Sequence, residues 1–259
     1  MIPKIIHYCW FGGNPLPESA KKCIASWRKF LPDYEIKEWN ESNYDVHKIP
    51  YIHEAYEAKK YAFVSDYARF DILYQNGGIY FDTDVEVIAP MNHIIEKGNF
   101  MGREAGAYIT DKELTAEPKG EAVNPGLGLG VAPGLGLYKE LLDGYAKRHF
   151  RREDGTLDTS TIVGYTTDFL LAHGMTNDNE HPQLVADVWI YPADVFCPMD
   201  HTKANKLNIT PNTVSIHHYD CTWLDKNTTE WRMHKLKENL SKIFGEKFIS
   251  KVADIIKGR

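Results

Sequence analysis

The sequence has few cysteines, no excess of basic charge and no long hydrophobic run. Its 259 residues carry 30 Lys+Arg against 36 Asp+Glu, a net charge of −6, which disfavours non-specific nucleic-acid binding because such binding depends on basic charge. The four cysteines include no Cys-x-x-Cys pair, which argues against a zinc ribbon and a disulfide framework. The apolar run after Met1 is too short for a signal peptide or a membrane span. These absences point to a globular protein, which we expect in the cytoplasm.

The charge is distributed unevenly along the chain. Residues 226–259 carry nine Lys/Arg and four Asp/Glu, a net charge of +5, which leaves −11 for residues 1–225. Apolar residues in this tail recur at spacings of three and four, which predicts an amphipathic helix. We therefore expect a core domain, residues 1–225, and a basic C-terminal helical extension, residues 226–259. Docking of the helix on the core is the favoured interpretation, and peripheral contact with the inner face of the cytoplasmic membrane is the alternative.

Strand-like and helix-like segments alternate through the first third of the chain. Residues 4–10 and 34–39 read as short buried strands, and residues 17–30 between them read as a helix. A strand, a helix and a strand at this spacing predict parallel pairing in an α/β sheet. A long helix over residues 55–75 follows and is stopped by Asn-Gly-Gly. Residues 79–81 then form another short strand.

Two carboxylates, Asp82 and Asp84, come directly after this third strand. On an extended segment, side chains two residues apart point to the same side, so the two carboxylates can converge. Adjacent carboxylates repel each other unless a cation lies between them, and a hard divalent cation, Mn²⁺ or Mg²⁺, suits oxygen ligands. The carboxyl end of a strand is also where α/β sheets bind ligands. The pair therefore predicts a divalent-metal site.

The preceding helix contributes a second polar group. Ser65, Asp66 and Arg69 share one helical face within an apolar and aromatic stretch. This setting favours a buried polar site over a surface ion pair. There, Asp66 can accept hydrogen bonds from sugar hydroxyls and Arg69 can neutralise phosphate.

The run from Ser65 to Asp84 reads Ser-Asp-x-x-Arg-x-x-x-Leu-x-x-x-Gly-Gly-x-Tyr-x-Asp-x-Asp and resembles the signature of glycosyltransferase family 32. That family includes yeast initiating mannosyltransferase-like enzymes and bacterial capsule and lipopolysaccharide sugar transferases. The glucosyltransferase domain of the large clostridial toxins carries a similar signature. The resemblance extends to segments 5–13 and 216–223, so the matched pieces bracket nearly the whole core domain.

The resemblance implies a GT-A fold, that is, a single Rossmann-like α/β domain with a mixed, mostly parallel central sheet. It also implies a metal-dependent, retaining glycosyltransferase of the hexosyltransferase type. The donor would be a nucleotide-diphosphate sugar, a UDP-sugar in the favoured interpretation and GDP-mannose in the alternative. The acceptor would be a glycan or a lipid-linked oligosaccharide in bacterial surface polysaccharide biosynthesis.

The resemblance also assigns roles to particular residues. The catalytic residues it implies are Asp84, Asp82, Arg69 and Asp66. The donor-binding residues it implies, with Trp10 stacking on the base and Trp223 capping the β-phosphate, are Trp10, Ser65, Asp66, Arg69, Tyr80, Asp82, Asn124 and Trp223. The metal ligands it implies are Asp84, Asp82 and one histidine. His217 and His218 are adjacent on an expected strand and point to opposite faces, so only one can face the metal. His218 is preferred because it directly precedes the aromatic residue, and His217 is the alternative.

Two other functions compete for the same residues. Haloacid-dehalogenase-like phosphatases also place Asp-x-Asp after an apolar strand, but they carry Thr or Val where this chain has Glu86, and their motif lies near the N-terminus. A catalytically silent nucleotide-sugar-binding protein would keep the base-stacking residue and lose its metal ligands. The intact Asp82, Asp84 and histidine pair argue against that second alternative.

Overall fold

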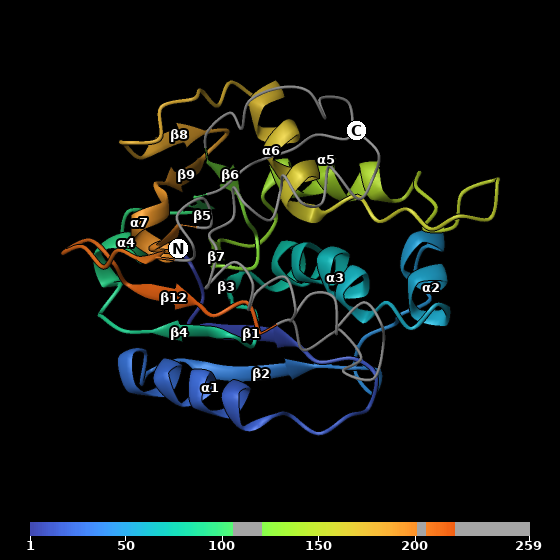
Figure 1. The fold of residues 1–259 in the computed structure, drawn as a ribbon, viewed down its shortest axis with the longest axis horizontal. Coiled ribbons are helices and arrows are strands. Elements are labelled where there is room, and N and C mark those ends of the chain that lie inside the picture. Colours follow the sequence, from blue (N-terminus) through green and yellow to red (C-terminus); the bar gives the residue numbers. More distant parts are fainter. Residues whose placement is uncertain (106–120, 201–205, 221–259) are drawn as a thin grey trace, which may run out of the picture.

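The computed structural model describes residues 1–105, 121–200 and 206–220, and its centre is a mixed β-sheet (Figure 1). The strand order is β2-β1-β3-β7-β5-β9-β8, with β6 paired to β5. Pairing is parallel in β2-β1-β3 and in β5-β9, and antiparallel where β7, β6 and β8 join. The strands of this sheet are β1 (Ile5–Cys9), β2 (Glu35–Trp39), β3 (Gly78–Tyr80), β5 (Phe100–Glu104), β6 (Ala122–Val123), β7 (Leu129–Val131), β8 (Gln183–Val185) and β9 (Val188–Tyr191).

Two further pairs of strands are antiparallel ribbons. One joins β4 (Val85–Val87) to β12 (Ser215–His217), and the other joins β10 (Met199–Asp200) to β11 (Lys206–Leu207). The first ribbon matters for the site because β4 begins directly after Asp84. It therefore brings a segment from residue 215 onward beside the Asp-x-Asp sequence.

Helices cover both faces of the sheet. The described helices are α1 (Glu18–Phe30), α2 (Pro50–Glu57), α3 (Tyr61–Asn76), α4 (Asn92–Ile95), α5 (Gly136–Tyr145), α6 (Ile162–Ala172) and α7 (Ala193–Phe196). Figure 1 shows α1 below β1, β2 and β4, and α3 on the opposite side of these strands. The mixed α/β architecture expected for a GT-A enzyme is confirmed.

Strand alternation decides which residues meet which helix. Ile79 and Phe81 of the third strand segment pack in the same core as Trp27 of α1, whereas Tyr80 packs in the core that contains α3. Because side chains two residues apart share a face, Asp82 emerges on the α3 side with Tyr80. This alternation places the first carboxylate beside Arg69.

The helix expected over residues 55–75 is two helices, α2 and α3. Between them Lys59 adopts the left-handed conformation, with φ 57°. The Lys59 amide donates to Tyr56 O (2.8 Å) and the Lys60 amide donates to Ala55 O (2.9 Å), the paired hydrogen bonds of a Schellman helix end. A lysine occupies the position where glycine usually signals such an end, so the sequence pattern hid the break.

His7 in β1 provides a prediction about stability and pH. Trp39 Nε1 donates to His7 Nδ1 (3.0 Å), and His7 Nε2 donates to Gly77 O (2.9 Å), so the neutral ring is fully hydrogen-bonded. Burial lowers the pKa of His7 from 6.5 to about 4. The unfolded chain therefore binds the proton more tightly, and this part of the stability is complete above pH 6.5 and is lost as the pH falls toward 4.

We expect this titration to lower the free energy of unfolding by about 2 kcal/mol at pH 5 relative to pH 7.5. Urea unfolding at the two pH values measures it, with His7→Asn as the variant that lacks the titrating group. The wild type should lose more stability than the variant over this interval. Equal losses in the two proteins would contradict the assignment.

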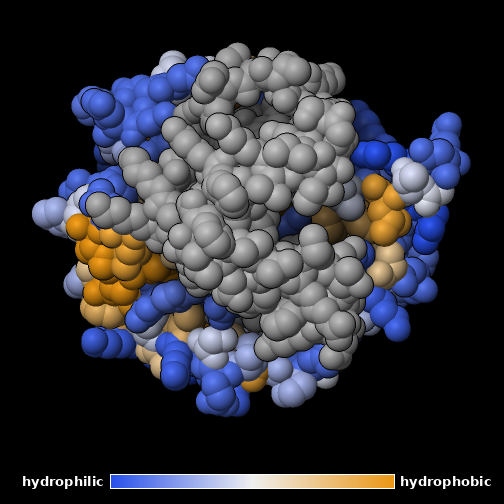
Figure 2. Space-filling view, in the orientation of Figure 1, coloured by the Kyte–Doolittle hydropathy of each residue, from blue (hydrophilic) through white to orange (hydrophobic). Residues whose placement is uncertain are grey.

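The described part of the face in Figure 2 is mostly hydrophilic, with hydrophobic areas at its left and right edges. Among the described residues, no helix combines the length and the apolar character that a membrane-spanning helix requires. The three described cysteines, Cys9, Cys23 and Cys197, are buried and unpaired. The expected extension, residues 226–259, lies outside the described residues.

Candidate metal and sugar-nucleotide site

A tight turn brings Asp82 and Asp84 together. The Val85 amide donates to Asp82 O (3.1 Å), so the three residues Asp82-Thr83-Asp84 fold back between β3 and β4 and do not stay extended as expected. The two carboxylates and His217 nevertheless form one group, with a ligand atom from each residue within 4.8 Å of the others. The convergence was predicted correctly, and the turn is its structural cause.

The histidine in this group is His217, not the preferred His218. His217 is buried, and its Nε2 lies 3.0 Å from Asp84 Oδ1. His218 is exposed, and its Nε2 lies 2.9 Å from Glu86 Oε2. In the β12–β4 ribbon His217 pairs with Val85, and the next side chain along the strand points to the other face. The geometry therefore corrects the choice in favour of the alternative.

Electrostatics couple Asp84 to His217. Burial alone would raise the pKa of Asp84, but the charge and hydrogen bond of His217 outweigh it and lower that pKa. For His217, burial opposes protonation and the Asp84 carboxylate outweighs this effect, so the pKa of His217 is raised. Asp84 is also held from its other oxygen, because the Asp220 amide donates to Oδ2 (3.0 Å). The second carboxylate of the motif is thus kept ionised and fixed in position.

A buried charged chain joins α3 to the turn. Arg69 Nη2 lies 2.9 Å from Asp66 Oδ1 and 3.3 Å from Asp82 Oδ1. Asp66 and Arg69 are both buried, with 8% and 4% of their surface exposed. Ser65 contributes through the backbone, since Arg69 Nε donates to its carbonyl (3.2 Å). The helical face predicted from the sequence is therefore a buried polar site that contacts the first aspartate.

Tyr80 completes this arrangement from β3. Its hydroxyl donates to Asp82 Oδ1 (2.9 Å), and the Arg69 guanidinium lies 5.0 Å from the centre of its ring. Burial, reinforced by the Asp82 charge, raises the pKa of Tyr80 well above its usual value. The hydroxyl therefore stays protonated and acts as a donor that orients Asp82.

Asn124 lies on the far side of Asp82 and is part of a hydrogen-bonded link that sequence reasoning did not find. Asn124 Nδ2 donates to Glu104 Oε2 (2.6 Å), which also accepts from the Tyr219 hydroxyl (2.5 Å). The ring of Tyr219 packs edge-on against His217, with ring centres 4.0 Å apart. Glu104 therefore connects the Asn124 turn to the histidine of the cluster.

The Asn124 turn also approaches Asp82 directly. Asn124 Oδ1 accepts from the Gly126 amide (2.7 Å), and the Gly126 carbonyl accepts from the Asp82 amide (3.0 Å). A Cβ at position 126 would collide with Asp82 Oδ2, so a larger residue here would displace the Asp82 carboxylate. Two residues of this link, Tyr219 and Glu104, were not predicted. The position of Tyr219 directly after the histidine pair could have indicated it, whereas no sequence pattern indicated Glu104.

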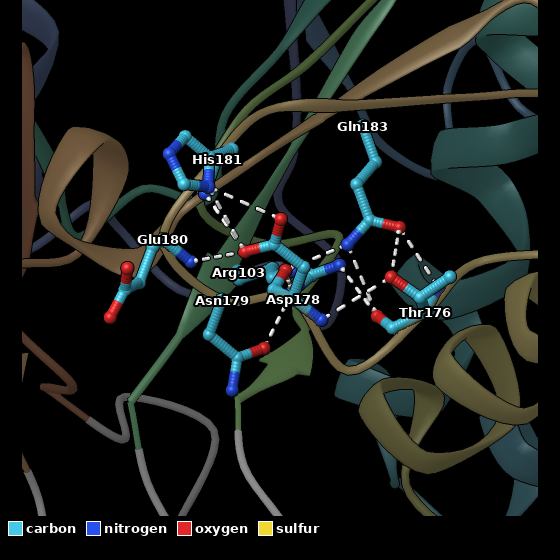
Figure 3. A network of polar contacts seen from close by, with 7 residues as sticks. All are labelled: Arg103, Thr176, Asp178, Asn179, Glu180, His181 and Gln183. Carbon is cyan, nitrogen blue, oxygen red and sulfur yellow. Dashed lines mark hydrogen bonds and ion pairs between the residues drawn. The ribbon is translucent and has the colours of Figure 1, made fainter.

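Arg103, next to Glu104 on β5, fixes the loop 176–183 (Figure 3). Its Nη1 donates to Asp178 O (2.6 Å) and to Asn179 Oδ1 (2.5 Å), and its Nη2 donates to Thr176 O (3.3 Å). Burial lowers the pKa of Arg103. The contacts between the loop and the buried Arg103 guanidinium thus anchor β5. Successive side chains of a strand point to opposite faces, so the neighbouring Glu104 points away from this loop and toward the site.

Trp10 lies at the carboxyl end of β1. It is half-buried, and its Nε1 donates to Asn14 O (2.6 Å). Because β1 and β3 are parallel neighbours, Trp10 leaves the sheet at the same edge as Asp82. Its stacking on a nucleotide base stays a prediction. The predicted phosphate contact, Trp223, lies outside the described residues.

The donor set of the cluster suits a divalent cation. Two carboxylates and one imidazole converge, and oxygen-rich sets of this kind suit Mn²⁺ and Mg²⁺. The buried Nδ1 of His217 has no hydrogen-bond partner in the described part of the chain. The polar groups around this ring therefore satisfy only one of its two nitrogens. The residues present therefore fit the metal that the Asp-x-Asp sequence implies, with Asp82, Asp84 and His217 as the residues that would hold it.

Comparison with known proteins finds similarity over part of the chain. Residues 17–101 match the model of the glycosyltransferase sugar-binding region containing the DXD motif. Inositol phosphoceramide mannosyltransferase 3 of Schizosaccharomyces pombe is 36% identical over 121 residues, and mannosyltransferase 1 of the same name and organism is 30% identical over 116 residues. These matches cover 44% and 39% of this chain and 33% of each relative, so they span a third of the relatives' length.

Two solved structures also align with this chain. The PaToxG glycosyltransferase aligns with a TM-score of 0.47 and 18% identity, covering 66% of this chain and 69% of its own. The galactosyltransferase LgtC aligns with a TM-score of 0.40 and 14% identity, covering 88% and 99%.

The motif defines the class of protein: a glycosyltransferase sugar-binding region whose DXD motif is Asp82-Thr83-Asp84, inside the matched residues. Residues 17–101 are thus similar to the sugar-binding region of glycosyltransferases that contain this DXD motif. The family predicted from the sequence is confirmed.

Proposed function

We propose that this chain transfers a sugar from a nucleotide-diphosphate donor to a glycan or lipid-linked glycan acceptor. The observation that carries the proposal is the convergence of Asp82, Asp84 and His217 beside the buried Asp66–Arg69 pair. A diphosphate and its sugar need a cation for the phosphates and hydrogen-bond acceptors for the hydroxyls. Both kinds of group meet here at the carboxyl edge of the parallel strands.

Each residue has a defined task in this proposal. Asp66 accepts hydrogen bonds from sugar hydroxyls, and Arg69 holds both Asp66 and Asp82 in place. Tyr80 orients Asp82 by donating to its Oδ1. A divalent cation, Mn²⁺ or Mg²⁺, held by Asp82, Asp84 and His217 would stabilise the negative charge that collects on a diphosphate leaving group. We propose retention of the anomeric configuration.

We propose mannose as the transferred sugar. The two curated relatives are named mannosyltransferases that act on inositol phosphoceramide, which supports mannose as the sugar and a lipid-linked acceptor. GDP-mannose therefore becomes the first donor to test, ahead of the UDP-sugars favoured from the sequence alone. A phosphatase is disfavoured because Glu86 stands where such enzymes carry Thr or Val.

A thermal-shift screen of UDP- and GDP-sugars, each with Mn²⁺ or Mg²⁺, tests the proposal. A bound donor stabilises the folded protein by mass action, by about 2.7 kcal/mol when its free concentration is 100 times its Kd. The melting temperature therefore rises. We expect one donor to shift the wild type in the presence of metal, and Asp84→Asn to lose the metal-dependent part of the shift. The proposal fails if no nucleotide sugar shifts the wild type with either metal.

A further inference from the structure

A second group of metal-ligating side chains lies away from the Asp-x-Asp turn, on α2 and the segment before it. It comprises His47, His53 and Glu57, and a ligand atom from each lies within 4.8 Å of the others. All three side chains are exposed. No role in the proposed sugar transfer uses these residues.

The backbone presets this group. His53 and Glu57 stand four residues apart on α2, so they share one face of the helix. His47 precedes the helix in a turn where its amide donates to Asp45 Oδ1 (2.9 Å). The next residue, Lys48, is tied to the buried carboxylate of Asp71 (2.7 Å). The His47 ring itself lies edge-on to His53 and Tyr56 of α2.

The contact between the two histidines is close. His47 Nδ1 lies 2.6 Å from His53 Nδ1, and the ring centres are 4.8 Å apart. Two imidazole nitrogens at this distance can coexist only if one carries a proton that the other accepts. A metal ion that binds both lone pairs replaces this shared proton, and the carboxylate of Glu57 supplies a third ligand and a negative charge.

We propose that His47, His53 and Glu57 bind a divalent transition-metal ion of the Zn²⁺ and Cu²⁺ type. Two imidazoles and one carboxylate are a ligand set that these ions favour, since imidazole suits Zn²⁺ and Cu²⁺ whereas Mg²⁺ and Mn²⁺ prefer oxygen. Tetrahedral Zn–N bonds of about 2.0 to 2.1 Å place two nitrogens about 3.3 Å apart. The rings therefore separate slightly on binding, which exposed side chains permit.

Isothermal titration of the untagged full chain with Zn²⁺ tests the proposal. Because the Asp-x-Asp cluster can also take Zn²⁺, the titration is repeated with Asp84→Asn, which should keep the site on α2. We expect His47→Ala and His53→Ala each to weaken that site by tenfold or more, and Glu57→Gln to weaken it as well. His181→Ala is the matched control, because His181 is an exposed histidine that contacts the Asp178 carboxylate, and it should bind as the wild type does.

Electron paramagnetic resonance of the Asp84→Asn variant with one equivalent of Cu²⁺ provides a second readout. We expect the Cu²⁺ signal to show splitting from two imidazole nitrogens. Circular dichroism confirms that each variant keeps its helices. The proposal is overturned if His53→Ala or His47→Ala binds Zn²⁺ as tightly as the wild type at every site. A Cu²⁺ spectrum that is unchanged in His53→Ala would overturn it equally.

Discussion

Asp84→Asn is expected to lower turnover of the sugar donor by about 100-fold or more while the protein stays folded. Asp84 pairs with His217 through Oδ1 (3.0 Å) and accepts from the Asp220 amide through Oδ2 (3.0 Å). An amide of the same shape keeps part of this hydrogen bonding, but it loses the negative charge that a divalent cation requires. Steady-state kinetics, with the fold checked by circular dichroism, measure the effect.

The matched control for this variant is Asp33→Asn, which also neutralises an aspartate. Asp33 is exposed and contacts Lys4 (3.4 Å), an ion pair of the exposed kind that contributes little. Turnover in Asp33→Asn should equal that of the wild type. If Asp84→Asn retained wild-type turnover, Asp84 would not hold the charge on which the proposed reaction depends.

Arg69→Met is expected to destabilise the fold by about 3 to 5 kcal/mol, the cost of removing one partner from a buried ion pair. Arg69 lies within 3.3 Å of both Asp66 and Asp82. Burial already raises the pKa of Asp66, and Arg69 opposes that rise. Without the guanidinium, the buried Asp66 carboxylate and the partly exposed Asp82 carboxylate lose the cation between them, so Asp66 takes up a proton or the site opens. Urea unfolding at pH 7 measures the loss.

The double variant Asp66→Asn with Arg69→Met separates this effect from lost packing. Neutralising Asp66 removes the uncompensated charge, so the double variant should recover part of the lost stability. Lys139→Met, which removes a cation from an exposed pair with Asp143, should leave stability nearly unchanged. Equal losses in the single and the double variant would show that Arg69 acts through packing and not through its charge.

Much of the fold could be predicted because its elements follow strong local rules. The strand at β1, the helix α1 and the end of α3 at Asn76 were all visible, and Gly77 and Gly78 adopt positive φ as the helix stop requires. The break between α2 and α3 was missed because Lys59 takes a conformation that sequence rules reserve for glycine. Val85–Val87 follows the third strand along the chain, but it pairs with β12 in a separate ribbon. That pairing joins residues far apart in the sequence, so no local pattern reports it.

In the site, too, local patterns could be read from the sequence and long-range pairing could not. Asp66 and Arg69 share a face of one helix, Tyr80 and Asp82 share a face of one strand segment, and the two pairs are in contact. Their roles in donor binding stay predictions. The choice between His217 and His218 depended on which face of β12 meets β4, and that is set by the register of the ribbon. Glu104 was missed for the same reason, since its role comes from the distant residues Asn124 and Tyr219.

The central claim is that Asp82, Asp84 and His217 form the metal-binding centre of a sugar transferase. The most direct test is release of nucleoside diphosphate from GDP-mannose and UDP-sugars by the purified protein, with Mn²⁺, with Mg²⁺ and with a chelator. We predict release with at least one donor in the presence of metal, loss of that release with the chelator, and a decrease of about 100-fold or more in Asp84→Asn. No release from any donor with either metal, together with unchanged Mn²⁺ binding in Asp84→Asn, would contradict the claim.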